Sequence, residues 1–147
     1  RPGAPNAAAS SFLSGMIRAP LAGVRAVCPV EPDTPVALSS PTRTLDGILR
    51  AAAVSTAEWG STTAMTLPAL STTPREMAEA LDRVAGAGTS DLIDWQRDAA
   101  IEAIVGSWPS QFRTDRAARL GLTADDSFDG IVAAYLDGVD AGSGAPA

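Results

Sequence analysis

The chain has 147 residues, of which 46% are hydrophobic and 19% charged, a composition typical of one globular domain. Its 17 acidic residues outnumber 11 arginines, and the net charge of −6 opposes binding to nucleic acid or to an anionic membrane surface. No apolar run approaches the roughly 20 residues that span a bilayer, and the first residues lack a signal-peptide layout, so we expect a cytoplasmic protein.

Two residue types are absent from the sequence, which contains neither histidine nor lysine. Catalytic triads that need histidine, zinc sites built on histidine and Schiff-base lysines are therefore excluded, and we assign no catalytic or metal-binding residue. The single cysteine, Cys28, lies in an apolar stretch and is expected to be buried. Tyr135 lies on the apolar stripe of a predicted helix, where packing is the expected role rather than catalysis.

The first half of the chain alternates between predicted helices and short strands. Small residues from Asn6 to Arg18 lead into large apolar residues on one side of a helix, which Pro20 is expected to end. Residues 26–30 and 36–39 are predicted as strands separated by a proline- and aspartate-containing turn. Residues 42–54 are predicted as a helix with one apolar face, because apolar residues recur there three and four positions apart.

The second half is predicted to add two strands, at 63–67 and 91–95, and four helices, at 74–85, 98–108, 114–120 and 127–136. The helix at 74–85 has the clearest start, because Thr73, Pro74 and Glu76 match a capping box with proline at the first helical position. Pro109 is expected to end the helix at 98–108. The last helix is expected to end at Asp137–Gly138, which leaves 139–147 as a disordered tail.

This alternation of strands and helices favours an α/β protein. The predicted strands are few for a parallel sheet covered by helices, so part of the sheet is expected to come from sequence outside this chain. The first methionine is residue 16, and we therefore expect the chain to be a piece of a longer protein.

Two stretches resemble one known family. The opening RPGAPNAAASSF at residues 1–12, followed by SGMIR and PLAG, resembles the passage after the catalytic helix in extended short-chain dehydrogenases. These enzymes are similar to NAD-dependent epimerases and dehydratases, and they include the D-erythronate dehydrogenases. The second stretch, from Ile93 to Ile131, contains IDW, WP, LG and SF at the family's spacing and resembles its C-terminal region.

The resemblance implies an extended Rossmann-type fold, of which residues 1–138 form the C-terminal, substrate-binding lobe with mixed helices and the late strands of the sheet. It implies that an N-terminal Rossmann half supplies a glycine-rich turn for NAD or NADP and a Tyr-x-x-x-Lys catalytic pair, so this segment alone is expected to be inactive. The whole protein is expected to oxidise a small sugar acid or hydroxy acid such as D-erythronate; whether it is a homodimer stays open.

The opening loop carries the residues that the resemblance implies for the cofactor and part of the substrate site. Pro2 and Gly3 are implied to lie at the nicotinamide end of the cofactor, where they would let the backbone pass close to a ligand; an ordinary turn is the alternative. Asn6, Ser10 and Ser11 are candidates for hydrogen bonds to the substrate, although they would equally cap the helix that begins here.

Arg43 is a further candidate, because a guanidinium binds both oxygens of a carboxylate and this residue follows the predicted strand at 36–39. A solvated surface arginine is the alternative. Two other functions share these features: a noncatalytic ligand-binding or structural domain, and a sugar epimerase or dehydratase on the same scaffold.

Overall fold

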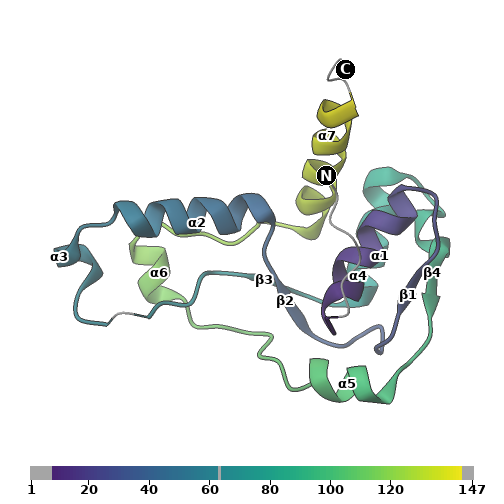
Figure 1. Cartoon of the computed structure of the whole chain (residues 1–147), viewed down its shortest axis with the longest axis horizontal. Helices are drawn as coiled ribbons and strands as arrows, with labels where there is room; N and C mark the ends of the chain where they lie inside the picture. Colours follow the sequence, from purple (N-terminus) through teal and green to yellow (C-terminus); the bar gives the residue numbers. More distant parts are fainter. Residues whose placement is uncertain (1–7, 63, 144–147) are drawn as a thin grey trace.

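The computed structural model describes residues 8–62 and 64–143, with side chains as far as Val139 (Figure 1). Its elements, in chain order, are α1 Ser11–Leu21, β1 Ala26–Cys28, β2 Val36–Leu38, α2 Pro41–Ala53, α3 Thr56–Trp59, β3 Leu70–Thr72, α4 Pro74–Ala85, the 3₁₀ helix η1 Thr89–Leu92, β4 Ile93–Trp95, α5 Ala99–Val105, α6 Asp115–Arg119 and α7 Phe128–Ser143. In this part of the chain, no helix combines the length and the apolar character that crossing a membrane requires.

The strands form two small sheets. β1 and β4 pair in parallel with Ala26 opposite Ile93, and β2 and β3 pair antiparallel with Val36 opposite Thr72. Helices and short strands are mixed along the chain, which confirms the predicted α/β fold class. The parallel sheet has only two strands among the described residues, fewer than such a sheet usually has.

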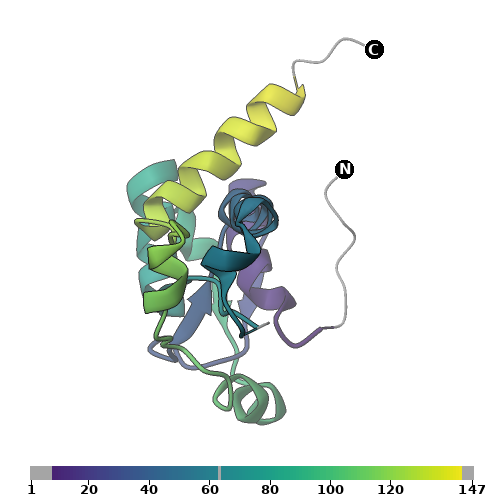
Figure 2. The same ribbon diagram turned by 90° about the vertical axis from the view of Figure 1, so that its left-hand side faces the viewer.

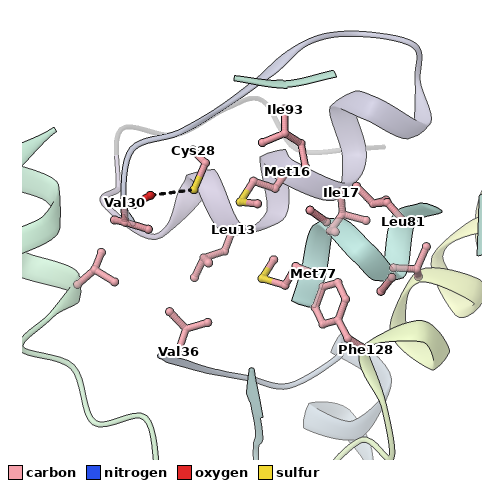
Figure 3. Packing of buried hydrophobic residues seen from close by; sticks show 14 residues of the cluster. Leu13, Met16, Ile17, Cys28, Val30, Val36, Met77, Leu81, Ile93 and Phe128 are labelled. Carbon is pink, nitrogen blue, oxygen red and sulfur yellow. Dashed lines mark hydrogen bonds between the residues drawn. The ribbon is translucent and has the colours of Figure 1, made fainter. Parts of the chain in front are cut away.

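The core lies where α1, α4 and the start of α7 meet the strands. Met16 of α1 and Met77 and Leu81 of α4 are fully buried there, and Phe128 of α7 closes one side (Figure 3). Cys28 of β1 is buried in the same cluster, as the sequence predicted. Two parts project from this core: α2 with α3 and α6 on one side, and α7 on another (Figures 1 and 2).

The predicted strand at 63–67 is wrong: residue 63 lies outside the described residues, and residues 64–67 form no strand. The guanidinium of Arg116 donates hydrogen bonds to the carbonyl oxygens of Trp59, Thr62 and Ala64, and it lies 5.0 Å from the centre of the Trp59 ring. Within the predicted strand, the carbonyl group of Ala64 is therefore bound by a side chain instead of by a neighbouring strand. The strand occurs later, as β3.

Several elements end or begin at other residues than predicted. α1 continues one residue past Pro20, because Ala22 and Gly23 donate to the carbonyls of the last turn and Gly23, with φ +72°, then ends it. α5 ends at Val105 rather than near Pro109, since tight turns replace helical hydrogen bonds after Gly106. Residues 91 and 92, predicted as strand, belong to η1.

α7 continues to Ser143, beyond the predicted end at Asp137–Gly138. A glycine inside a helix costs only about 1 kcal/mol, and no proline follows within the helix, so the helix does not stop there. Residues 139–143 of the predicted tail are therefore helical, and residues 144–147 lie outside the described residues.

Candidate functional site

A groove of about 950 Å³ lies between α1, α7 and the connection from β2 to α2. Its walls are mainly apolar, with Leu13 and Ile17 from α1, Leu38 from β2 and Phe128 and Ile131 from α7. The helical spacing of these residues places them on the facing sides of α1 and α7.

The wall at the start of α2 is held by hydrogen bonds. The Ser40 hydroxyl accepts from the backbone N–H of Arg43 at 3.1 Å and caps α2, and Pro41 occupies the first helical position. The backbone N–H of Ser40 donates to Oδ2 of Asp125 at 2.8 Å. Because Ser40 is buried and bonded on both sides, its hydroxyl serves the backbone rather than a ligand.

Of the residues predicted in the opening loop, the structure describes only Ser10 and Ser11. Pro2, Gly3 and Asn6 lie outside the described residues. Ser10 precedes α1, is exposed, and makes no side-chain hydrogen bond that caps the helix; Ser11 is half-buried, and its carbonyl accepts from the Ser14 hydroxyl at 3.0 Å. Neither serine is part of the groove lining.

Arg43 is likewise not part of the groove lining. Its Nη2 lies 3.9 Å from Oδ2 of Asp126, a residue 83 positions later in the chain that no sequence pattern links to it. The groove therefore does not bring Arg43 together with Ser10 and Ser11.

Among the described residues that line the groove, only Arg18 is charged. It lies four positions after Ser14, and both residues contribute to the same wall of α1. Arg18 is not among the site residues predicted from the sequence, although its helical spacing from the apolar residues of α1 places it at the edge of their face.

The other titratable groups show structural roles. Tyr135 lines the groove from α7, half-buried among apolar residues, which agrees with packing. Burial raises the pKa of the Cys28 thiol, and this thiol lies 3.6 Å from the carbonyl oxygen of Val30. A buried thiol with a raised pKa is a poor nucleophile. Within residues 8–62 and 64–143, no group of three or more carboxylate or thiol side chains lies close enough together to bind a metal ion.

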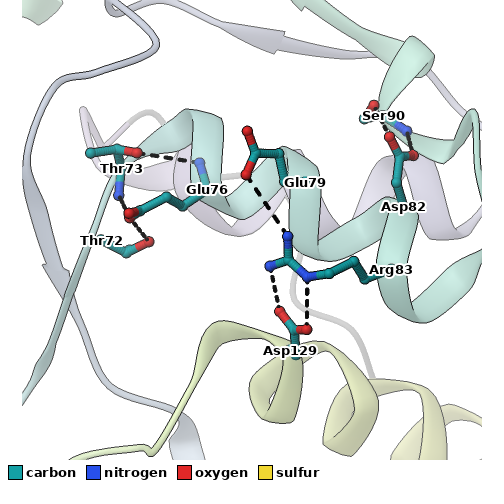
Figure 4. Close-up of polar contacts among 8 residues, drawn as sticks. All are labelled: Thr72, Thr73, Glu76, Glu79, Asp82, Arg83, Ser90 and Asp129. Atoms are coloured by element: carbon teal, nitrogen blue, oxygen red, sulfur yellow. Dashed lines mark hydrogen bonds and ion pairs between the residues drawn. The ribbon is translucent and has the colours of Figure 1, made fainter.

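Carboxylates outside the groove link elements to one another. Arg83 of α4 makes two hydrogen bonds to Asp129 of α7, at 2.9 and 2.7 Å, and lies 3.8 Å from Glu79 (Figure 4). Asp82 accepts both the backbone N–H and the hydroxyl of Ser90, which ties α4 to η1. These donors hold the pKa of Asp129 and of Asp82 below the usual range.

The described residues do not fit a nicotinamide dinucleotide by themselves. A dinucleotide pyrophosphate is usually held by a glycine-rich turn between a strand and a helix. The comparable passage here, from β2 into α2, is Ser39–Ser40–Pro41, in which proline lacks a backbone N–H and the N–H of Ser40 is bound to Asp125. We therefore assign no step of hydride transfer to these residues.

No protein-family model matches the chain. It is similar to a D-erythronate dehydrogenase from Cupriavidus necator, with 46% identity over 142 residues that cover 97% of this chain and 43% of that protein. A D-erythronate dehydrogenase from Haemophilus influenzae is 35% identical over 93% of this chain and 44% of its own length. The chain thus spans less than half the length of these relatives.

Solved structures give the same correspondence. The nucleoside-diphosphate-sugar epimerase from Agrobacterium tumefaciens superposes with a TM-score of 0.88 and 35% identity over 93% of this chain and 40% of that one. The L-threonine 3-dehydrogenase from Trypanosoma brucei, at 18% identity, shares the fold, with a TM-score of 0.82 over 99% of this chain and 44% of that one. These comparisons confirm the resemblance found in the sequence. The chain corresponds to the C-terminal part of a protein of the extended short-chain dehydrogenase and epimerase family.

Proposed function

We propose that the chain is the substrate-binding C-terminal portion of an NAD- or NADP-dependent oxidoreductase that acts on a small sugar acid or hydroxy acid such as D-erythronate. The observation that carries this proposal is the 46% identity, over 97% of the chain, to a D-erythronate dehydrogenase. The cofactor turn and the Tyr-x-x-x-Lys pair are assigned to an N-terminal Rossmann half, and the 147-residue chain alone is expected to be inactive. A cytoplasmic location and a homodimer stay predictions.

In this proposal the start of α1 forms one side of the substrate site. Pro2 and Gly3 lie beside the nicotinamide, and Asn6, Ser10 and Ser11 orient the substrate hydroxyls. The exposed hydroxyl of Ser10, which does not cap α1, supports such a role because it is free to turn toward a ligand.

Arg43 is proposed to bind the substrate carboxylate. Its separation of 3.9 Å from Asp126 is long for an ion pair, and the Asp126 side chain is almost fully exposed. An exposed contact of this kind contributes little stability, so a bound carboxylate would replace it at small cost.

The test compares the whole protein with the 147-residue chain, each assayed with D-erythronate and either NAD or NADP. We expect turnover only from the whole protein.

Arg43→Ala should raise the KM for the acid about tenfold, the effect of losing one charged hydrogen bond, and leave the KM for the cofactor unchanged. Arg113→Ala is the control, because Arg113 also lies 3.9 Å from a carboxylate.

Cofactor-dependent turnover by the isolated chain would contradict the assignment of the catalytic residues to the other half. A whole protein that binds D-erythronate without oxidising it would instead favour a noncatalytic ligand-binding or structural domain.

The second candidate is a sugar epimerase, which the 35% identity to the nucleoside-diphosphate-sugar epimerase supports. The two functions differ in products. A dehydrogenase accumulates reduced cofactor in proportion to substrate consumed, whereas an epimerase returns its cofactor to the starting state. Reduced-cofactor absorbance with chromatography of the products therefore separates them.

A further inference from the structure

The helix α2 turns its apolar face away from the rest of the chain. Leu45, Ile48 and Leu49 recur at three and four positions, the spacing of a buried stripe, yet they are 56%, 55% and 60% exposed. The opposite side of the helix contacts the chain instead. Gly47 is buried there beside Leu67 and Leu122, and Nε of Arg50 donates to the carbonyl oxygen of Leu120 at 2.7 Å. This arrangement is the reverse of that expected for a surface helix.

The exposed stripe is continuous with the groove. At about 100° per residue, Pro41 and Thr42 lie on the same side of α2 as Leu45, Ile48 and Leu49, and both line the groove. The groove walls of α1 and α7 and this side of α2 therefore form a single surface, which we call the α2–groove surface. Figure 1 shows the start of α2 beside the base of α7, from which the two helices project in different directions.

The composition of this surface does not suit a sugar acid. A sugar acid carries several hydroxyls and a carboxylate, which require convergent polar groups in a binding pocket. The groove offers mainly aliphatic and aromatic side chains, and the stripe on α2 adds three more large apolar groups. An apolar surface of this extent is typical of a protein interface.

We propose that the α2–groove surface is where the N-terminal half of the same protein docks; this inference rests on the proposed function. The relatives indicate this occupant. The chain spans 43% and 44% of the two D-erythronate dehydrogenases, so more than half of each relative's length lies outside the part that this chain matches. The proposal places the interface along α2 and the groove, and leaves the start of α1 for substrate.

The test measures thiol labelling at single cysteines in the whole protein and in the 147-residue chain, with peptide-resolved mass spectrometry. Leu45→Cys and Leu49→Cys probe the stripe. Arg119→Cys, at an exposed position on α6 beside the opposite side of α2, is the matched control. Cys28 gives little background, because it is buried.

At concentrations at which the isolated chain is monomeric, we expect labelling at positions 45 and 49 to be at least about tenfold slower in the whole protein than in the isolated chain, while position 119 changes little. Equal rates in the two proteins would overturn the proposal. Protection that disappears on dilution, together with dissociation of a dimer, would overturn it in favour of a second copy as the occupant.

The result is independent of catalysis. Protected thiols in a whole protein without dehydrogenase activity would support the docking surface and contradict the proposed function. Turnover by a whole protein in which positions 45 and 49 are labelled freely would support the proposed function and contradict the docking surface.

Discussion

Gly121 occupies a position that other residues would fit poorly. Its φ is +76°, and a Cβ atom there would lie 2.6 Å from Nε and 2.7 Å from Cζ of Arg50. We expect Gly121→Ala to destabilise the chain by about 1–2 kcal/mol, because it combines backbone strain with displacement of the Arg50 side chain. Urea denaturation would measure this loss. Gly138→Ala, in α7 with open space around it, is the control and should be neutral or slightly stabilising.

The ion pair between Arg83 and Asp129 predicts a pH dependence. Arg83 lowers the pKa of Asp129 from its ordinary 3.8, so the pair contributes stability above that value, and this contribution is lost as the pH falls below it. Asp129→Asn should therefore be less stable than the parent at pH 7, and the difference should vanish in acid. Unfolding curves at several pH values measure it, with Asp137→Asn on the same helix as control. A constant difference across the range would contradict the prediction.

Two helices begin with the same capping box but differ in what they bury. Thr73 and Glu76 cap α4 (Figure 4), and this helix contributes Met77 and Leu81 to the core. Ser55 and Glu58 cap α3, which buries no residue. Thr73→Ala should lower the free energy of unfolding by about 1 kcal/mol.

Ser55→Ala, the matched substitution, should change it much less, because a four-residue helix frays without exposing the core. Chemical denaturation of the two variants tests the comparison. Equal losses would mean that α3 unfolds together with the core.

Local signals decide which elements the sequence predicts well. α4 was predicted with its correct bounds because a capping box, a proline and Gly86 mark both ends within the sequence. The strand predicted at 63–67 does not form, and Arg116, more than 50 residues later, binds the carbonyl oxygen of Ala64 within that segment and of Thr62 just before it. A contact of this kind has no local pattern.

The candidate site was less predictable than the fold for the same reason. The resemblance led to the start of α1, but the partner of Arg43 lies in another part of the chain, and the groove depends on how α1, α7 and α2 meet. The spacing of Leu45, Ile48 and Leu49 indicates an apolar face on α2 but not its direction. That direction is set by Gly47 and Arg50, which attach the other side to the chain.

Across the whole molecule, the buried core and the exposed apolar surface are separate. The core joins α1, α4 and α7, whereas α2 extends away from it and has one buried residue, Gly47 (Figure 1). The helices of the core are therefore expected to hold together without the rest of the protein, while α2 contributes little to that stability. The short strands have few neighbours in the described chain, which lowers stability further.

The 147-residue chain alone is accordingly expected to unfold over a broad temperature range and to associate through α2. Circular dichroism should show helix content that melts with weak cooperativity, and size-exclusion chromatography should show species larger than a monomer as concentration rises. Replacing Leu45, Ile48 and Leu49 together by serine should restore a monomer, because it removes the exposed stripe. Val24→Ser is the control, since Val24 is equally exposed, at 57%, but lies away from α2. A sharp transition from a clean monomer of the parent chain would show instead that this segment folds as an independent domain.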